Sequence, residues 1–197
     1  MNTLRNSSVP KLSVALLHYP VKNKNGEIIT SAVTNLDLHD IARTAKTYGI
    51  DSFFVVTPLD DQRALVEKIV SHWTEGWGGE YNPKRKTALR LIRVKSTLDQ
   101  AVAEIEAEID HPVRVVVTCA AQKPGALKFE AFRRRLNDEE ASCAYLLAFG
   151  TAWGLTDEFL SSCDFILEPV QGAADYNHLP VRSAVAIILD RLLGTGR

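Results

Sequence analysis

Short runs of purely apolar residues alternate along this chain with stretches of helical periodicity. The runs FFVV at residues 53–56 and VVV at residues 115–117 carry no polar side chain. A strand of this kind is buried on both faces, as in parallel sheets that helices cover on either side. The alternation therefore predicts an α/β fold with a mostly parallel sheet and helices on both faces.

The same alternation gives the positions of the expected elements. Residues 34–49 form the clearest helix, because their apolar side chains recur at helical spacing, Asn35 or Asp37 can cap the start, and Gly49 can end it. The other expected helices are residues 60–73, 97–109, 128–136 and 180–193. The expected strands are residues 12–19, 52–57, 89–94, 114–118, 144–149 and 165–167. A glycine-rich turn is expected through Gly76, Gly78 and Gly79.

The composition indicates one folded domain over residues 1–197. Hydrophobic side chains make up 46% of the chain and charged ones 24%, and the formal net charge is −1. No apolar run approaches the ~20 residues that span a bilayer, and residues 1–11 lack the apolar stretch of a secretory signal. We therefore expect a cytoplasmic protein with no membrane partner. The near-zero charge argues against a protein that coats DNA or RNA by electrostatics alone.

The three cysteines, Cys119, Cys143 and Cys163, are widely separated. This spacing offers neither a CxxC metal pair nor an even disulfide framework. We expect reduced, mostly buried thiols and no metal site.

Three loops at the carboxyl ends of expected strands are candidates for a ligand site, because open parallel sheets bind ligands there. They are GTAWGL at residues 150–155, EPVQG at 168–172 and DYNHLP at 175–180. Backbone groups amid apolar walls suit an adenine-like ring better than a phosphate cluster. GTAWGL matches neither GxGxxG nor GxxxxGK[ST], so both phosphate-binding fingerprints are missing. The alternative is that its two glycines merely form a turn.

Four segments in order resemble the motifs of SPOUT-superfamily RNA methyltransferases. They are NLDLHDIARTAKTYGIDSFFVVTP (residues 35–58), LLAFGTAWGL (146–155), ILEPVQG (166–172) and YNHLPVRSAVAIILDRLL (176–193). The sequence as a whole is similar to a bacterial family within this superfamily, close to the tRNA guanine-N1 methyltransferase branch. The resemblance covers nearly the whole chain.

The resemblance implies a deep trefoil knot at the C-terminal end, a homodimer with a shared active site, and an S-adenosylmethionine (SAM) cofactor that leaves as S-adenosylhomocysteine. The knot goes beyond general folding rules, under which knots are rare exceptions. By position, the resemblance places the cofactor against Thr118, Ala120, Phe149, Gly150, Gly154, Leu167, Pro169, Asn177, Leu179 and Ser183.

The first helix supplies one set of catalytic candidates. In the related SpoU branch, an Asn before this helix and an Arg within it form the catalytic motif, and Asn35 and Arg43 resemble that pair. Their spacing is eight rather than the usual six, so Asp37 is an alternative for the Asn position. The alternatives without catalysis are a helix cap for Asp37 and a solvated helix face for Arg43.

The last loop and helix supply the other candidates. Arg182 lies in the first turn of the expected last helix, where a cation opposes the helix dipole. It is expected to meet an RNA phosphate or the cofactor carboxylate, or else to point into solvent. His178 and Asp175 are candidate bases, with ordinary loop roles as the alternatives.

RNA contact is expected at two basic clusters and one aromatic group. The clusters are Lys84, Arg85 and Lys86 with Arg90, Arg93 and Lys95, and the run Arg133, Arg134 and Arg135; solvated helix faces are the alternative. The aromatic group is Trp73, Trp77 and Tyr81, which could stack on unpaired bases, close a core edge or line a dimer interface.

The leading functional hypothesis is a SAM-dependent methyltransferase acting on tRNA or rRNA as a homodimer. The alternative is a non-catalytic knotted module that binds a nucleoside or RNA without turnover. A third hypothesis, methylation of a protein or small molecule, stays open at this point.

Overall fold

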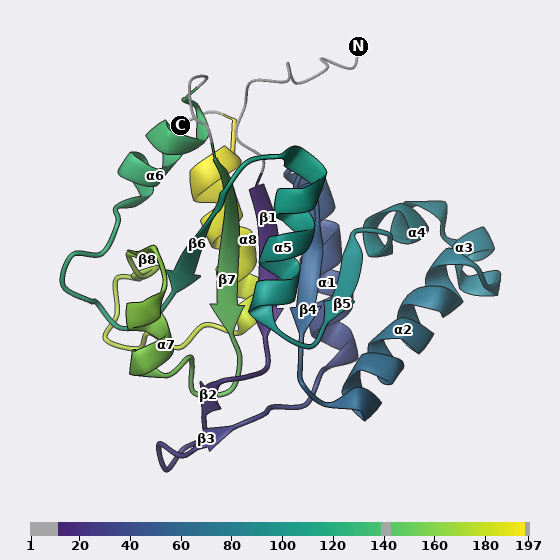
Figure 1. Ribbon diagram of the computed structural model, residues 1–197, viewed down its shortest axis with the longest axis horizontal. Coiled ribbons are helices and arrows are strands. Elements are labelled where there is room, and N and C mark those ends of the chain that lie inside the picture. The colour runs from purple at the N-terminus through teal and green to yellow at the C-terminus, as the bar shows by residue number, and fades with distance from the viewer. Residues whose placement is uncertain (1–11, 139–142, 196–197) are drawn as a thin grey trace.

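The computed structural model describes residues 12–138 and 143–195, which form a sheet with helices on both faces (Figure 1). Six parallel strands pair in the order β5-β4-β1-β7-β6-β8. Their bounds are β5 Ile92–Lys95, β4 Phe53–Val56, β1 Leu12–Leu17, β7 Ala144–Gly150, β6 Val113–Thr118 and β8 Phe165–Leu167. The predicted α/β class with a mostly parallel sheet is confirmed.

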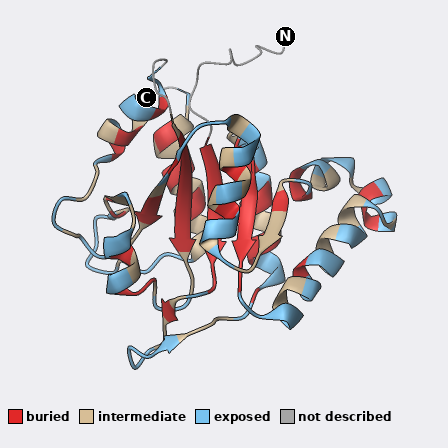
Figure 2. Cartoon of the chain, viewed as in Figure 1, coloured by how far each residue is buried: buried red, intermediate tan, exposed pale blue. Residues whose placement is uncertain are grey.

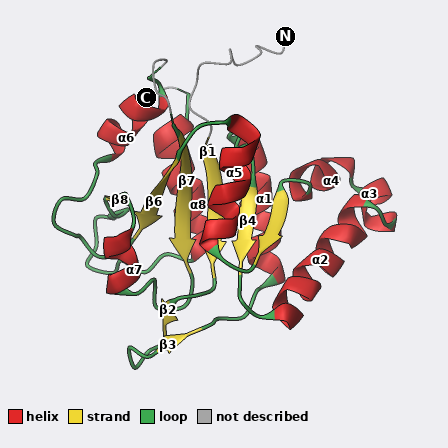
Figure 3. Cartoon of the chain, viewed as in Figure 1, coloured by secondary structure: helices red, strands yellow, loops and turns green. Residues whose placement is uncertain are grey.

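Helices cover each face of the sheet in a separate layer (Figure 3). One layer holds α1 Asn35–Thr47, α2 Asp60–Thr74, α4 Pro83–Leu89, α6 Phe129–Leu136 and α8 Val181–Leu193. The other holds α5 Leu98–Ile109 and α7 Asp157–Ser162. The short helix α3 Trp77–Tyr81 packs on α2 and α4. A short ribbon of β2 Val21–Lys22 and β3 Ile28–Ile29 lies apart from the main sheet.

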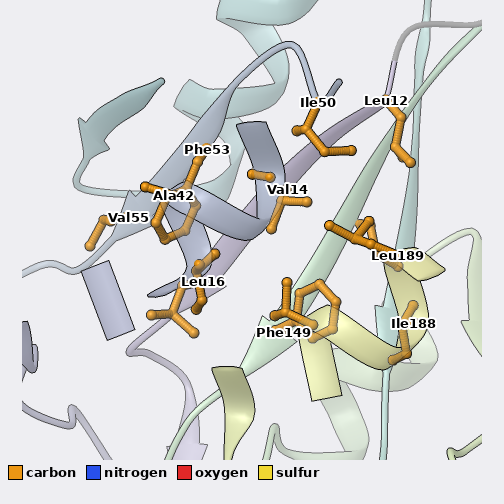
Figure 4. Close-up of a cluster of buried hydrophobic side chains, with 14 of the residues drawn as sticks. Leu12, Val14, Leu16, Ala42, Ile50, Phe53, Val55, Phe149, Ile188 and Leu189 are labelled. Atoms are coloured by element: carbon orange, nitrogen blue, oxygen red, sulfur yellow. The ribbon is translucent and has the colours of Figure 1, made fainter. Parts of the chain in front are cut away.

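The strands are buried because alternate residues contribute to two different apolar clusters. In β1, Val14 and Leu16 pack toward α1 and α8, whereas Ala15 and Leu17 pack toward α5 and α7. Figure 4 shows the first cluster, and Figure 2 shows burial concentrated in the central strands. This two-sided burial is the physical basis of the apolar runs from which the sheet was predicted.

The start of α1 differs from the prediction, since Thr34 is its cap. The extended backbone of Thr34 brings its Oγ1 to accept from the Asp37 backbone N–H at 3.3 Å. That hydroxyl also donates to Asp37 Oδ2 at 2.7 Å. Asn35 and Asp37 therefore lie inside the helix, and the expectation that one of them caps it is wrong.

The expected glycine-rich turn is instead a second helical region. Gly76 caps α3, and Gly78 and Gly79 are buried within it. Asn82 caps α4 because its side chain accepts a hydrogen bond from the Arg85 N–H. Pro83, the first residue of α4, also favours a helix start at this point. The following strand, expected at residues 89–94, consequently begins only at Ile92.

The cysteines are free thiols of intermediate burial, and each packs against one of the two apolar clusters. In the described part of the chain, every helix is too short or too polar to cross a lipid bilayer.

Candidate functional site

A cavity of about 940 Å³ lies at the carboxyl ends of β6, β7 and β8. Its walls come from residues 118–123 after β6, residues 149–155 at the end of β7, and residues 168–170 and 176–181 after β8. Ser31 and Thr34, which precede α1, and Asp37, in its first turn, close another side. The structure thus brings the three predicted loops together at the edge where parallel sheets bind ligands.

Most of the residues predicted to bind a cofactor line this cavity. They are Thr118, Ala120, Phe149, Gly150, Gly154, Pro169, Asn177 and Leu179. Two do not line it. Leu167 is buried in the core behind the wall, because it pairs with Thr118 as the last residue of β8. Ser183 lines a neighbouring groove.

Backbone and side-chain hydrogen bonds fasten the loops after β6 and β8 to each other. Asn177 Nδ2 donates to the Ala120 carbonyl at 2.9 Å. The Leu127 N–H donates to the Ile166 carbonyl at 2.7 Å, and the Glu168 N–H donates to the Leu127 carbonyl at 2.9 Å. Glu168 Oε1 in turn accepts from the Phe129 N–H at 2.6 Å, at the start of α6. These bonds give the cavity a fixed wall.

The two glycines of the GTAWGL loop have different structural roles. A Cβ at Gly150 would come within 2.7 Å of Leu155 Cγ, so this glycine permits a close packing contact. Gly154 has a φ of +91°, and a Cβ there would meet nothing within 4 Å. Gly154 therefore leaves open space beside the cavity, as a ligand-binding loop requires.

A partly buried hydrogen-bond chain, which the sequence did not reveal, reaches the cavity wall at Ser31 and Thr151. His18 Nδ1 lies 2.9 Å from Ser31 Oγ, Ser31 Oγ lies 2.5 Å from Thr151 Oγ1, and Thr151 Oγ1 donates to the Leu17 carbonyl at 3.1 Å. Since Thr151 has one proton to donate, Ser31 donates to Thr151 and accepts from His18 Nδ1–H. Burial lowers the pKa of His18 to about 4, despite opposing effects of Asp37 and Ser31. The imidazole is therefore neutral near pH 7.

Asp37 is a buried carboxylate on the cavity wall. Its Oδ2 accepts from Thr34, whereas its Oδ1 is buried without a hydrogen-bond partner among the described residues. Arg182 Nη1 lies 3.5 Å from that Oδ1, and Arg182 Nε lies 3.5 Å from Asp40 Oδ2. Two carboxylates of α1 thus offset the unfavourable position of Arg182 at the start of α8. None of the roles expected for Arg182 included this pairing.

A second hollow of about 510 Å³ lies between α1 and α8 and is lined by Arg43, Arg182 and Ser183, among others. It adjoins the cavity, because Arg182 lines the groove and its partner Asp37 lines the cavity. Arg43 is exposed there, and the described residues give its guanidinium no carboxylate partner. Asn35 lies exposed in the first turn of the same helix.

The two loop candidates for a base differ in position. His178 lines the cavity mouth, is exposed, and contacts the Tyr176 ring edge-on with 6.3 Å between ring centroids. Asp175 is exposed and lines neither hollow.

A charged cluster that sequence reasoning missed lies at the cavity rim. Asp157 accepts from Lys123 Nζ at 2.7 Å and lies 3.5 Å from Lys22 Nζ. These lysines, Lys123 first, lower the pKa of Asp157, and Asp157 raises the pKa of Lys123. The cluster joins the β2 segment, the loop after β6 and α7, which are far apart in sequence.

Several basic side chains expected to bind RNA instead contact other residues of the protein. Arg93 donates to Glu104 at 2.8 Å, and Lys95 also pairs with Glu104. Arg135 covers the Phe165 ring, with 4.5 Å between its guanidinium carbon and the ring centroid, and Arg133 Nη2 donates to the Gly194 carbonyl at 3.3 Å.

The aromatic group divides in two. Trp73 packs at the edge of the core, whereas Trp77 and Tyr81 are exposed.

Comparison with known proteins gives the family context. Residues 11–194 match the model of a family described as SAM-dependent RNA methyltransferase. A protein of Oleidesulfovibrio alaskensis called tRNA (guanine-N(1)-)-methyltransferase is 44% identical over 183 residues, which are 93% of this chain and 42% of that protein. An uncharacterised protein of Aquifex aeolicus is 40% identical over 184 residues, which are 93% of this chain and 89% of that one. The chain thus spans less than half of the first relative and most of the second.

Solved structures share the fold at low sequence identity. A probable methyltransferase from Bordetella pertussis Tohama I superposes with a TM-score of 0.62 at 17% identity, covering 94% of this chain and 95% of that chain. The SpoU methyltransferase AviRb from Streptomyces viridochromogenes, in complex with AdoMet, superposes with a TM-score of 0.55 at 17% identity, covering 96% of this chain and 60% of that chain.

Proposed function

The chain belongs to the family of SAM-dependent RNA methyltransferases, and from that premise we propose that it transfers a methyl group from SAM to a nucleotide of tRNA or rRNA. The cavity at the carboxyl ends of β6, β7 and β8 carries this proposal. Its volume, about 940 Å³, is in the range of small-molecule sites, roughly 300–1,000 Å³. Gly154 leaves open space beside it, and the mainly apolar walls fit a nucleoside.

The cofactor would lie against the three loops. Phe149, Leu155 and Pro169 offer apolar surface, and the backbone of the loops after β6 and β7 offers hydrogen-bonding groups. When bound, SAM supplies a methyl group activated by a sulfonium. The protein has then to orient the acceptor and, where the acceptor carries a proton, to accept it.

Asp37 is the strongest candidate for that base. It is a buried carboxylate on the cavity wall, and its Oδ1 makes no hydrogen bond in the described part of the chain. Arg182 beside it holds the carboxylate in place. Arg43 and Asn35, on the same helix, would orient the RNA from the adjoining groove. His178 and Asp175 are more exposed and rank behind Asp37.

We further propose a homodimer whose active site is shared, and a knotted C-terminal segment, in a cytoplasmic protein. Exposed apolar side chains at the cavity mouth, Trp153, Tyr176 and Leu179, support a partner surface there. The segment that follows β8 contacts the loop after β6 through Asn177 and Ala120, as the proposed threading requires.

The guanine-N1 activity named for the Oleidesulfovibrio protein refers to a chain more than twice as long as the matched region. The Aquifex relative, matched over 89% of its length, indicates that this domain also occurs without that additional part.

The test is methyl transfer to RNA by the purified protein. Tritiated SAM is incubated with total RNA from a strain that lacks the protein, and the labelled nucleoside is identified by mass spectrometry. We expect label in one nucleoside of tRNA or rRNA. Binding of S-adenosylhomocysteine without any incorporation would instead favour the non-catalytic binding module, and label in lysate protein would favour a protein substrate.

A further inference from the structure

The connection between β4 and β5 forms a lobe at the opposite edge of the sheet from the cavity. It carries α2, α3 and α4, and β5 is the edge strand farthest from β8 (Figure 1). The 15 residues of α2 correspond to about 22 Å of helix, which sets α3 well away from the carboxyl ends of the strands. None of the roles in methyl transfer proposed above involves this lobe.

Two large aromatic side chains stand exposed on α3. Trp77 is 69% exposed and Tyr81 is 75% exposed, and the two rings stack with centroids 5.2 Å apart and an interplanar angle of 22°. They lie four residues apart, on one face of the helix. Each ring therefore has a neighbour on one side and is accessible from solvent.

Glycine packing keeps this pair turned outward. A Cβ at Gly79 would lie 2.5 Å from the Trp73 carbonyl oxygen, and a Cβ at Gly78 would lie 2.9 Å from His72 Nε2. The glycine side of α3 thus lies directly against the end of α2, with no room for a side chain. Trp73 fills the inner space, held edge-on to His39 and under the Arg85 guanidinium. The outward pair is consequently a fixed feature of the lobe.

Basic side chains follow the exposed pair in sequence, with Lys84 in the first turn of α4 and Arg90 at its C-terminal end. Residues 77–90 contain four basic side chains and a single acidic one, Glu80. Lys84 and Arg90 are exposed, and neither makes an ion pair within residues 12–138 and 143–195. This contrasts with Arg93 and Lys95 on the next strand, which are held by Glu104.

We propose that Trp77 and Tyr81, with Lys84 and Arg90, bind an unpaired segment of RNA, one base stacking on the rings and the phosphates meeting the cations. Flat aromatic faces beside basic side chains are the chemistry of single-stranded RNA recognition. A second copy of the chain suits the patch less well, because Glu80 lies between the two aromatic residues in α3 and four basic residues follow them on and after α4. The core of a protein interface is depleted of charge, and a standard one buries about 800 Å² per partner. The inference rests on the proposed function and adds a docking point remote from the reaction site.

The test measures RNA binding without cofactor, so that it does not depend on catalysis. The probe is a fluorescein-labelled, 12-nucleotide single-stranded RNA of mixed sequence, followed by anisotropy, with a duplex of equal length for comparison. We expect tighter binding of the single strand, and a loss of about fivefold or more in affinity for Trp77→Ala and for Tyr81→Ala. Trp77→Phe should retain most of the affinity, because it keeps an aromatic face.

Two matched variants separate stacking from charge and from general surface effects. Leu65→Ala removes another exposed apolar side chain of the same lobe and should leave the affinity unchanged. Lys84→Ala should reduce the slope of log affinity against log salt by about 0.7, the value for one phosphate contact on a single strand. Thermal unfolding of each variant should match the wild type, since both rings are exposed.

Three results would overturn the inference: unchanged affinity in both alanine variants, preference for the duplex, or loss of self-association in Trp77→Ala with RNA affinity intact. The last would assign the patch to a second copy. S-adenosylhomocysteine binding by calorimetry, measured in parallel, reports on the cavity. Its failure would count against the proposed function and would leave the RNA result standing by itself.

Discussion

The two glycine-rich stretches of this protein look alike in sequence and differ in space. Around residues 76–79 the glycines allow a helix to lie against backbone, since a Cβ at Gly79 would be 2.5 Å from the Trp73 carbonyl oxygen. At residues 150–154, Gly154 faces open space beside a cavity of about 940 Å³. A glycine motif by itself therefore does not identify a ligand site. The cavity that the glycine lines does.

Buried polar atoms without hydrogen-bond partners occur in both regions, within the parts of the chain described. They are Asp37 Oδ1 and His18 Nε2 at the cavity, and His39 Nδ1 and Arg85 Nε at the lobe. Their surroundings differ, because Asp37 lines the cavity, whereas the His39 ring and the Arg85 guanidinium pack against Trp73. We therefore expect changes at the cavity to alter chemistry, and changes under the lobe to alter folding.

Asp37→Asn should produce the largest effect. Loss of a general base lowers turnover by about 10²–10⁴-fold, while S-adenosylhomocysteine affinity should stay within about twofold of wild type because the shape of the wall is kept. Single-turnover methyl transfer and calorimetry measure the two quantities. An equal loss in Asp175→Asn, with Asp37→Asn active, would place the base in the exposed loop instead.

Acid should destabilise the cavity region through His18. The pKa of His18 falls from 6.5 to about 4 on folding because of burial, so only the unfolded chain gains this proton as pH drops. The contribution of His18 to the free energy of unfolding should be fully present above pH 6.5. It should decrease by about 3 kcal/mol as the pH falls toward 4. Urea unfolding at several pH values checks this. His18→Gln should make the free energy of unfolding depend less on pH than His39→Gln does. A similar pH dependence in the two variants would contradict the prediction.

Gly79→Ala should lower the free energy of unfolding by about 1–3 kcal/mol, because the new methyl group overlaps backbone that packs tightly. Denaturant melts provide the measurement. Gly172→Ala is the control, since a Cβ there meets nothing within 4 Å and the backbone is not in the left-handed region. S-adenosylhomocysteine affinity should not change in either variant, and equal stability of the two would contradict the packing argument.

Gly154→Leu should lower the free energy of unfolding less than Gly79→Ala does, and should weaken S-adenosylhomocysteine binding more. The left-handed backbone at φ +91° costs an L-residue about 1–2 kcal/mol, and the side chain extends into space beside the cavity. We expect weaker S-adenosylhomocysteine binding by calorimetry. Unchanged affinity would show that the ligand lies elsewhere, and Gly125→Leu, at another left-handed glycine outside the cavity, controls for backbone strain.

Local patterns predicted the regular elements well. The helical spacing of residues 34–49 corresponds to α1, and the apolar run at residues 53–56 is β4. The region of α3 and α4 was missed because Gly and Pro punctuate it, and both residues usually indicate turns. There the glycines serve interhelical packing and Pro83 occupies the first helical position.

The candidate site was predictable where it follows the sheet. Loops after neighbouring parallel strands must meet at one edge, and this brought eight of the proposed cofactor residues to the cavity. Ser183 did not follow, because successive residues of α8 point about 100° apart. Ala184 and Ile188 therefore face the cavity while Ser183 and Ala186 face the groove. The hydrogen-bond chain from His18 through Ser31 to Thr151 includes a bond between residues 120 positions apart, Ser31 and Thr151, which no local pattern predicts.

The amino-acid order alone determined the strands that are buried on both faces, the helices between them and the family to which the chain belongs. These depend on periodicity and on motifs, which are local properties of a sequence. Tertiary structure alone decided which glycine has free space, why Arg182 tolerates a helix start, and which aromatic rings remain in solvent. Such properties depend on what distant segments place beside a residue, and no short stretch of sequence contains that neighbour.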